Sequence, residues 1–276
     1  MAGHMVALYL SEHGYQVTGF AKQQKNLGHD ISYVEGDALD QKLVRKVIQE
    51  GNYDVVINCI GILNKAVDAK LSDGIYLNSV FPHFLVDCVK DMDTKVVHIS
   101  SDCVFTGNEG HYKEDSKPDA DSYYGKTKAL GELIDDKNLT FRTSIVGPEL
   151  KEDGIGLFHW FMSQSGYVNG FTEVIWSGVT TLELAKAIDV ALQQGLTGLY
   201  HLVNNKEISK HDLLCLFNRY LNENKTEIHE NGSFSNNKSL LDTRQELNHE
   251  VPSYETMICE MAEWMENHRE LYCYYF

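Results

Sequence analysis

The sequence contains no hydrophobic run long enough to cross a membrane. The longest apolar stretch near a predicted strand, VVINCIGIL at residues 55–63, already includes Asn58 and Gly61, whereas a spanning helix needs about 20 apolar residues. The first residues also lack the basic and apolar regions of a secretory signal peptide. We therefore expect a cytoplasmic protein with no membrane partner.

Basic clusters and paired cysteines are missing too. The chain has 24 Lys and Arg against 40 Asp and Glu, a net charge of −16, and no stretch concentrates the basic residues. A nucleic-acid-binding surface is therefore not expected. The six cysteines are scattered without a CxxC pair, which argues against a disulfide framework and favours a reducing compartment.

Motifs of several large enzyme classes are also absent. The 12 histidines show no HExxH or other paired spacing, so no metal site is indicated. Neither G-x-S-x-G nor GxxxxGKS occurs, so hydrolase and P-loop chemistry lack support.

The first half of the chain alternates strand-like and helix-like segments. Short β-branched and apolar runs end in Gly, Asp, Asn or Ser, as buried parallel strands do. Between them, apolar residues recur at spacings of three and four, which predicts helices. This alternation predicts an α/β fold with a Rossmann-like, doubly wound parallel sheet. The predicted strands are 15–20, 31–37, 53–61 and 95–101, and the predicted helices are 41–51 and 73–91.

After residues 141–147 the alternation becomes less regular. We predict a strand at 198–203 and a long polar loop over 222–239, which is rich in Asn. Helices are predicted near 155–164, 181–194, 209–221 and 254–269.

Tyr124 and Lys128 form a Y-x-x-x-K pair at the start of a predicted helix, where residues four apart share a face. Ser101 ends a predicted strand, where α/β sheets place their ligands. The three side chains would converge on a carbonyl, with Ser101 holding its oxygen and Tyr124 delivering a proton. Lowering the tyrosine pKa from about 10 by ~3 units takes ~4 kcal/mol, which Lys⁺ can partly supply. From spacing alone, a surface helix with a solvated lysine remains an alternative.

Three segments together resemble the extended short-chain dehydrogenase/reductases, and in particular the dTDP-4-dehydrorhamnose reductase family. They are ISSDCVFTG (99–107), YYGKTKALGE (123–132) and RTSIVG (142–147), and the resemblance extends over nearly the whole chain. It implies that Ser101, Tyr124 and Lys128 are catalytic. It also implies that Ser101, Asp102 and Ile145 contact the substrate.

The same resemblance implies a dinucleotide site. The segment GFAKQQK carries Lys22 and Lys25 with no acidic residue before Asp30, which favours NADP(H), with NAD(H) as the alternative. Asp37 has a second interpretation, as the N-cap of a helix over 39–50. The implied cofactor-binding residues are Gly3, His4, Met5, Lys22, Asp37, Ala38, Cys59, Gly61, Ile62, Asn78, Tyr124 and Lys128.

The chain departs from this family at its beginning. Residues 1–15 already resemble the first helix of the fold, and Gly3 matches the last glycine of the family's GxxGxxG motif. The first strand and the earlier glycines of the turn are not in the sequence. We therefore expect the natural start to lie upstream, with a protein that works without that turn as the alternative.

The resemblance implies reduction of the C4 keto group of a nucleotide-linked 4-keto-6-deoxy sugar by NAD(P)H, for cell-surface polysaccharide synthesis. Residues 1–147, with 175–203 returning to them, would form the dinucleotide-binding domain, and residues 148–174 and 204–276 a smaller substrate-binding lobe. Cys103 and the segment GIGLFHWF differ from the rhamnose enzymes, so a UDP-linked 2-acetamido sugar is a second substrate candidate. The alternatives are a nucleotide-sugar epimerase and a regulatory subunit resembling the methionine adenosyltransferase β-subunit. The chain is expected to be a monomer or a homodimer.

Overall fold

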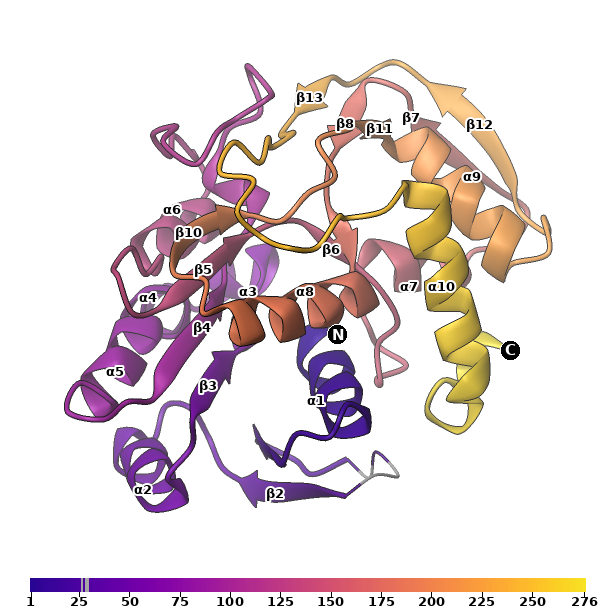
Figure 1. Cartoon of the computed structure of the whole chain (residues 1–276). Helices are drawn as coiled ribbons and strands as arrows, with labels where there is room; N and C mark the ends of the chain where they lie inside the picture. Colours follow the sequence, from indigo (N-terminus) through magenta and orange to yellow (C-terminus); the bar gives the residue numbers. More distant parts are fainter. Residues whose placement is uncertain (26, 28–29) are drawn as a thin grey trace.

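The computed structural model describes residues 1–25, 27 and 30–276. Its centre is a parallel sheet of four strands in the order β10–β5–β4–β3, and β1 and β2 form a separate parallel pair (Figure 1). In the described part of the chain, no strand pairs with the second edge of β1 or of β3. The strands are β1 (Val17–Ala21), β2 (Ile31–Glu35), β3 (Val55–Asn58), β4 (Lys95–Ile99), β5 (Leu139–Arg142) and β10 (Gly198–His201).

Helices cover both faces of the central sheet, which confirms the predicted α/β class with a parallel sheet. Strand β4 is buried on both sides, as a central parallel strand should be. Its Val96 packs with Ile48 and Leu85 of the helices on one face, and its Val97 packs with Met5 and residues of α8 on the other. These helices are α1 (Ala2–Glu12), α2 (Gln41–Gly51), α5 (Phe81–Cys88) and α8 (Thr181–Gln194).

Helix α2 begins as predicted at residue 41, but its cap differs from the expectation. Asp40 is the N-cap, and its side chain accepts hydrogen bonds from the amides of Lys42 and Leu43. The interpretation of Asp37 as the N-cap is therefore wrong, because the side chain at the residue before the helix is the one that reaches these amides.

The single helix predicted over 73–91 is broken in the structure. A turn of π-helix over Tyr76–Val80 separates α4 (Leu71–Ile75) from α5. Pro82 has no amide hydrogen for the carbonyl of Asn78, so the regular ladder cannot continue at that point. The π turn buries Asn78, which is one of the predicted site residues. A short α3 (Asn64–Ala69) precedes this region.

The second half of the chain adds three small sheets and three helices, α7, α9 and α10, beside the central sheet (Figure 1). The loop predicted over 222–239 is wrong in part, because β12 pairs with β7 and β13 with β8. This pairing depends on partners about 60 residues earlier, which the polar local sequence does not reveal. The elements are β6 (Ile145–Val146), α7 (Leu157–Met162), β7 (Tyr167–Phe171), β8 (Val174–Trp176), β9 (Val179–Thr180), β11 (Ile208–Ser209), α9 (Lys210–Leu221), β12 (Glu227–Asn231), β13 (Asn236–Asn237) and α10 (Tyr254–Asn267).

Candidate active site

Helix α6 (Tyr123–Leu130) carries Tyr124 and Lys128 to the carboxyl end of β4. Its start is fixed by Ser122, whose hydroxyl oxygen accepts a hydrogen bond from the amide of Gly125 at 3.1 Å. Gly125 also permits a close approach, since a Cβ there would stand 2.1 Å from the carbonyl oxygen of Cys103. Tyr124 and Lys128 are both buried as a result. The helix therefore packs directly on the turn that holds Ser101.

Ser101 follows β4 and is buried beside Asp102. Its hydroxyl donates to Oδ1 of Asp102 at 3.0 Å and accepts from the amide of Cys103 at 3.1 Å. The structure thus brings Ser101, Asp102, Tyr124 and Lys128 to one region, while their catalytic and substrate-binding roles stay predictions. Ile145 lies on the short strand β6 and is half-buried.

The pKa of Tyr124 is shifted in the direction opposite to the expectation. Burial, followed by the nearby Cys103 and Asp102, raises it above the usual value of 10.0 for a tyrosine. The predicted lowering by Lys128 is wrong for this arrangement because the lysine is engaged elsewhere. Its Nζ lies 2.6 Å from the carbonyl oxygen of Ile99 and 3.2 Å from Nε2 of His98. Burial also lowers the pKa of Lys128 to about 8.

Asn78 connects the π turn to α6 and to the segment after β3. Its Oδ1 accepts from the amide of Ile62, and its Nδ2 donates to the carbonyl of Ile62 and to Oγ1 of Thr127, at 3.0, 3.0 and 3.2 Å. Helix α6 can approach closely here because it ends at Gly131, where a Cβ would stand 2.0 Å from the carbonyl oxygen of Asn78. These hydrogen bonds brace α6, as the resemblance implies for Asn78, and its predicted cofactor contact stays a prediction.

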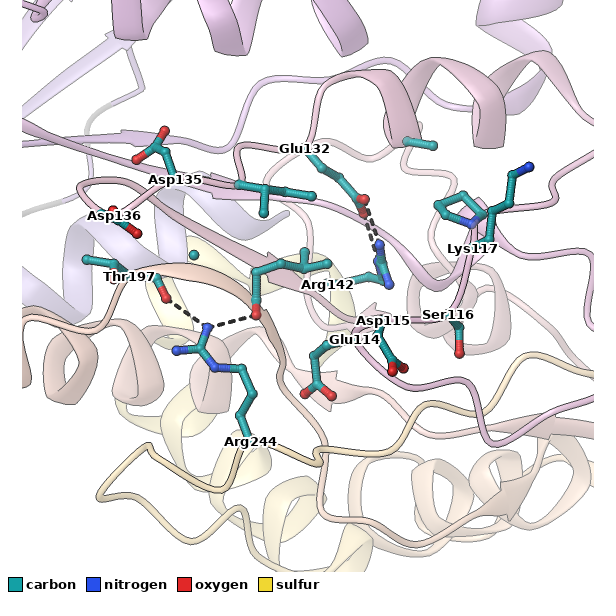
Figure 2. A pocket seen from close by; sticks show the side chains of 15 residues that line it. Glu114, Asp115, Ser116, Lys117, Glu132, Asp135, Asp136, Arg142, Thr197 and Arg244 are labelled. Carbon is teal, nitrogen blue, oxygen red and sulfur yellow. Dashed lines mark hydrogen bonds and ion pairs between the residues drawn. The ribbon is translucent and has the colours of Figure 1, made fainter.

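A buried ion pair that the sequence analysis did not identify lies behind Ser101. The Arg142 guanidinium donates from Nε and Nη2 to the two carboxylate oxygens of Glu132, at 2.8 and 2.6 Å (Figure 2). The hydroxyl of Ser100 donates to the same carboxylate. The side chains are only 1% and 3% exposed. Both residues lie in the segments that carry the family resemblance, and this was the sequence signal that could have identified them. The pair joins the end of α6 to β5.

Lys210 is a second residue that the sequence analysis missed. It begins α9, and its ammonium lies 5.1 Å from the centre of the Trp176 ring. Among the described residues, no acceptor lies at hydrogen-bonding distance from this ammonium. Burial lowers the pKa of Lys210 to about 8, although the nearby Asp102 and Cys103 act to raise it. A lysine at the start of a helix gives no sequence signal for such a position.

The predicted cofactor-binding residues lie at neighbouring strand ends, but they are not equally accessible to a ligand. Lys22 and Asp37 follow β1 and β2 and form an exposed ion pair of 3.0 Å. The pKa of Asp37 is lowered, first by the hydrogen bond from the amide of Leu39 and then by Lys22. Gly61 and Ile62 follow β3, with Gly61 exposed and Ile62 half-buried. Since open α/β sheets bind ligands beyond the carboxyl ends of their strands, these positions fit a dinucleotide.

Other predicted cofactor-binding residues have side chains that point into the protein. The side chain of Met5 is fully buried in the core, and Nε2 of His4 is bonded to the hydroxyl of Tyr272 at 2.9 Å. These two side chains pack inside the protein, and the predicted cofactor contact of His4 and Met5 stays a prediction. A Cβ at Gly3 would make only an ordinary contact of 3.5 Å with Cys59, so packing does not require glycine there. Ala38 is buried, and Cys59 is half-buried.

Figure 2 shows a cavity of about 890 Å³. Neither Ser101 nor Tyr124 is among the residues that line it. It opens beside Asp135 and Asp136, which precede β5, and beside Gly198 at the amino end of β10. Arg244 is tied there to the carbonyls of Thr197 and Leu199.

Within the described residues, no group of three or more His, Cys, Asp or Glu could hold a metal ion. No helix in the same residues is long and apolar enough to span a bilayer.

Comparison with known proteins finds a matching family model and several relatives of moderate identity. Residues 2–240 match the RmlD substrate binding domain. The chain is 26% identical over 230 residues to the probable low-salt glycan biosynthesis reductase Agl14 of Haloferax volcanii, covering 77% of this chain and 74% of the relative. It is 26% identical over 202 residues to the spore coat polysaccharide biosynthesis protein SpsK of Bacillus subtilis, covering 71% and 67%. A third relative is the methionine adenosyltransferase 2 subunit beta of Xenopus laevis, 25% identical over 196 residues, covering 64% of this chain and 57% of that subunit.

Solved structures share the fold. A hypothetical dTDP-4-dehydrorhamnose reductase of Sulfolobus tokodaii superposes with a TM-score of 0.76 at 23% identity, covering 90% of this chain and 93% of that one. The dTDP-4-dehydrorhamnose reductase of Bacillus anthracis, in complex with NADP, gives 0.75 at 18% identity, covering 91% and 100%. A UDP-N-acetylglucosamine 4-epimerase of Methanobrevibacter ruminantium gives 0.78 at 17% identity, covering 97% and 95%. These likenesses confirm the Rossmann-like architecture predicted from the strand and helix alternation.

Proposed function

The chain belongs to the RmlD substrate binding domain family, and from this premise we propose that it reduces the C4 keto group of a nucleotide-linked 4-keto-6-deoxy sugar with NAD(P)H. The observation that carries the proposal is the packing of α6 on the turn after β4, which buries Tyr124 beside Ser101. Relatives named as a glycan biosynthesis reductase and a spore coat polysaccharide protein support a role in cell-surface polysaccharide synthesis.

The proposed chemistry assigns one role to each side chain. Bound nicotinamide would supply the hydride. The hydroxyl of Ser101 would turn from Asp102 to the substrate oxygen, and Tyr124 would give that oxygen its proton. Because burial raises the pKa of Tyr124, the phenol keeps its proton at neutral pH. That is the protonation state which a reduction requires of its acid.

We assign the dinucleotide to residues 1–147, with 175–203, and the nucleotide sugar to 148–174 and 204–276. NADP(H) is favoured because Lys22 stands at the end of β1 with its side chain 66% exposed, free to turn from Asp37 to a 2′-phosphate. NAD(H) is the alternative.

Fluorescence titration with NADPH and NADH tests the cofactor assignment. Trp160, Trp176 and the nicotinamide supply the signal. We expect micromolar binding, with NADPH preferred. Lys22→Ala should weaken NADPH binding about tenfold, or ~1.4 kcal/mol, and leave NADH binding unchanged. Lys46→Ala, an exposed change on α2, serves as the control. Absence of binding, both in this chain and in a form extended upstream of Met1, would contradict the proposed function.

Lys210 is proposed to bind the diphosphate of the substrate, since its ammonium faces Asp102 and Cys103 without a described hydrogen-bond acceptor. Lys210→Met should raise the Kd for dTDP and UDP about tenfold, measured by calorimetry. Lys206→Met is the matched control, because Lys206 is exposed nearby. The affinity of the unaltered protein should fall as the pH rises through about 8, where Lys210 loses its charge. Equal affinities in Lys210→Met and the control would refute this role.

Two alternatives remain open to direct test. An epimerase keeps its dinucleotide bound throughout the cycle, so tightly held NAD⁺ in the purified protein would favour that function. If the chain has a regulatory role, as the subunit-beta relative suggests, it would reduce none of a panel of 4-keto nucleotide sugars. Oxidation of NADPH by any sugar of that panel would favour the reductase.

A further inference from the structure

Lys210 lies against the face of an aromatic ring near the candidate active site. The antiparallel pairing of β11 with β8 sets Ile208 opposite Trp176. Lys210 begins α9 two residues later, and its Nζ lies 5.1 Å from the centre of the Trp176 ring. At that distance an ammonium is attracted to the negative face of an indole, which is a cation–π contact. The register of the two strands therefore brings the two side chains together.

The Trp176 ring is fixed by packing. Trp176 is only 3% exposed, and the Tyr254 ring of α10 packs against it with 5.7 Å between the ring centres. Gly178 lies between the Trp176 ring and the carbonyl of Ser144, because a Cβ there would stand 2.3 Å from Cζ2 of Trp176 and 2.0 Å from that oxygen. Nε1 of Trp176 is buried with no hydrogen-bond partner among the described residues. Packing thus makes the ring a rigid surface for the flexible lysine.

The ammonium of Lys210 is half-buried, and in the described part of the chain it makes neither a hydrogen bond nor an ion pair. Removing a charge from water is unfavourable unless another group compensates, and the face of the Trp176 ring is in the position to do so. Burial lowers the pKa of Lys210 to about 8, while Asp102 and Cys103 act to raise it. With this pKa the lysine is mostly charged at pH 7. Its three N–H donors are therefore available to an anionic ligand.

A second lysine approaches the same turn from another segment. The amide of Asn237 donates to the carbonyl oxygen of Gly107 at 2.8 Å, which places the segment around β13 on the residues that follow Ser101. The positive charge of the next residue, Lys238, acts to lower the pKa of Cys103, although burial raises it to about 12 overall. A ligand beside Cys103 would meet the positive charges of both Lys210 and Lys238, which favours an anion.

We propose that Trp176 is a positioning residue: the face of its indole keeps the Lys210 ammonium charged, with its donors unused, beside the turn that carries Ser101, where it binds the diphosphate of the nucleotide sugar. The proposal rests on the proposed function for the identity of that anion. A lysine held by a ring has no acceptor to release before it binds phosphate, so less of the binding free energy is lost to rearrangement. Because the contact exists without a ligand, it can be tested separately from the reaction.

The first test changes the electrons of the ring and leaves its shape almost unaltered. Replacing tryptophan in the full chain by mono-, di- and trifluorotryptophan weakens the negative potential of the ring face stepwise. Lysine labelled with ¹³C at Cε reports the pKa of each ammonium, and Lys210→Arg identifies the Lys210 signal by its loss. We expect the pKa of Lys210 to fall with each added fluorine, by about 0.5–1.5 units in total, because the ring stabilises the charged form.

Lys206 is the control in the same samples, because it is exposed nearby and should keep its pKa. Among the described residues, Trp176 is the only tryptophan with a lysine or arginine over its ring, so fluorination of the other two should not affect Lys210. A pKa of Lys210 that stays constant or rises with fluorination would overturn the proposal and leave the reductase function standing.

The second test connects the ring to the ligand through UDP binding, measured by calorimetry at pH 7. Phenylalanine attracts a cation less than tryptophan does, so Trp176→Phe should raise the Kd for UDP about threefold. In the Lys210→Met background the same change should have no effect, because no ammonium remains for the ring to hold. Trp264→Phe is the matched control on α10, where the ring stacks on His268, and it should leave the Kd unchanged.

An equal loss of affinity from Trp176→Phe with and without Lys210 would show that the ring only supports the fold, and would overturn the proposal. If Lys210→Met binds UDP as tightly as the unaltered protein, the diphosphate role of Lys210 is refuted, and the fluorinated proteins still decide whether the ring holds the ammonium. If Trp176→Phe does not fold, UDP titration of the fluorinated proteins replaces it. The Kd should then rise with each added fluorine, and a constant Kd would refute the link to the diphosphate.

Discussion

Tyr124→Phe is expected to lower kcat of the proposed reduction by about 10²–10⁴-fold, the usual contribution of a general acid. The substitution removes only the phenolic oxygen, and the ring keeps its buried position against the turn after β4. The loss should therefore appear in kcat rather than in the affinity for NADPH. The kcat is measured from NADPH oxidation with the best sugar of the panel, and the affinity for NADPH by fluorescence titration.

Tyr123→Phe is the matched control, because Tyr123 is the preceding residue on α6 and its side chain is exposed. Its kcat should stay within about twofold of the unaltered protein. Retention of activity in Tyr124→Phe would contradict the proposal that Tyr124 is the acid. It would also contradict the interpretation of the Y-x-x-x-K pair as catalytic. For the unaltered enzyme, the acid form of Tyr124 should persist above pH 10.0, the usual tyrosine pKa, because burial raises it.

Breaking the buried Glu132–Arg142 pair should be the most destabilising change in the site. Glu132→Leu leaves the Arg142 guanidinium buried at 1% exposure without its counter-charge, which costs about 3–5 kcal/mol. Urea unfolding of the two proteins measures the difference. The double change Glu132→Leu with Arg142→Met should be less destabilised than the single one, because no charge is then left uncompensated.

The more exposed pair Arg244–Glu246 is the control. It has similar two-point geometry, with bonds of 3.1 and 2.7 Å, but Glu246 is 53% exposed. Glu246→Gln should cost no more than about 1 kcal/mol, because water screens the pair. A comparable loss of unfolding free energy in Glu132→Leu and Glu246→Gln would contradict the view that burial makes the loss large at Glu132.

The order of strands and helices in the first half could be predicted from the sequence, because each buried parallel strand is a short apolar run between amphipathic segments. Strand β4 illustrates this, since KVVHI is buried along its length. The pairing of β12 with β7 could not be predicted, because main-chain hydrogen bonds between distant segments form that sheet and its polar residues carry no pattern. The break at the π turn was missed because residues 73–91 keep their apolar spacing through it, although Pro82 was a local signal for it.

For the site, the sequence by itself determined which residue types stand at the end of β4 and on one face of α6, because spacing on a helix and position after a strand are local properties. Only the tertiary structure decided their electrostatic state. The direction of the Tyr124 shift, the lowered pKa of Lys128 and the bracing contacts of Asn78 depend on burial and on hydrogen-bond partners from other elements. A residue's proton affinity depends on every dipole and charge that surrounds it in three dimensions, and chain order does not specify these neighbours.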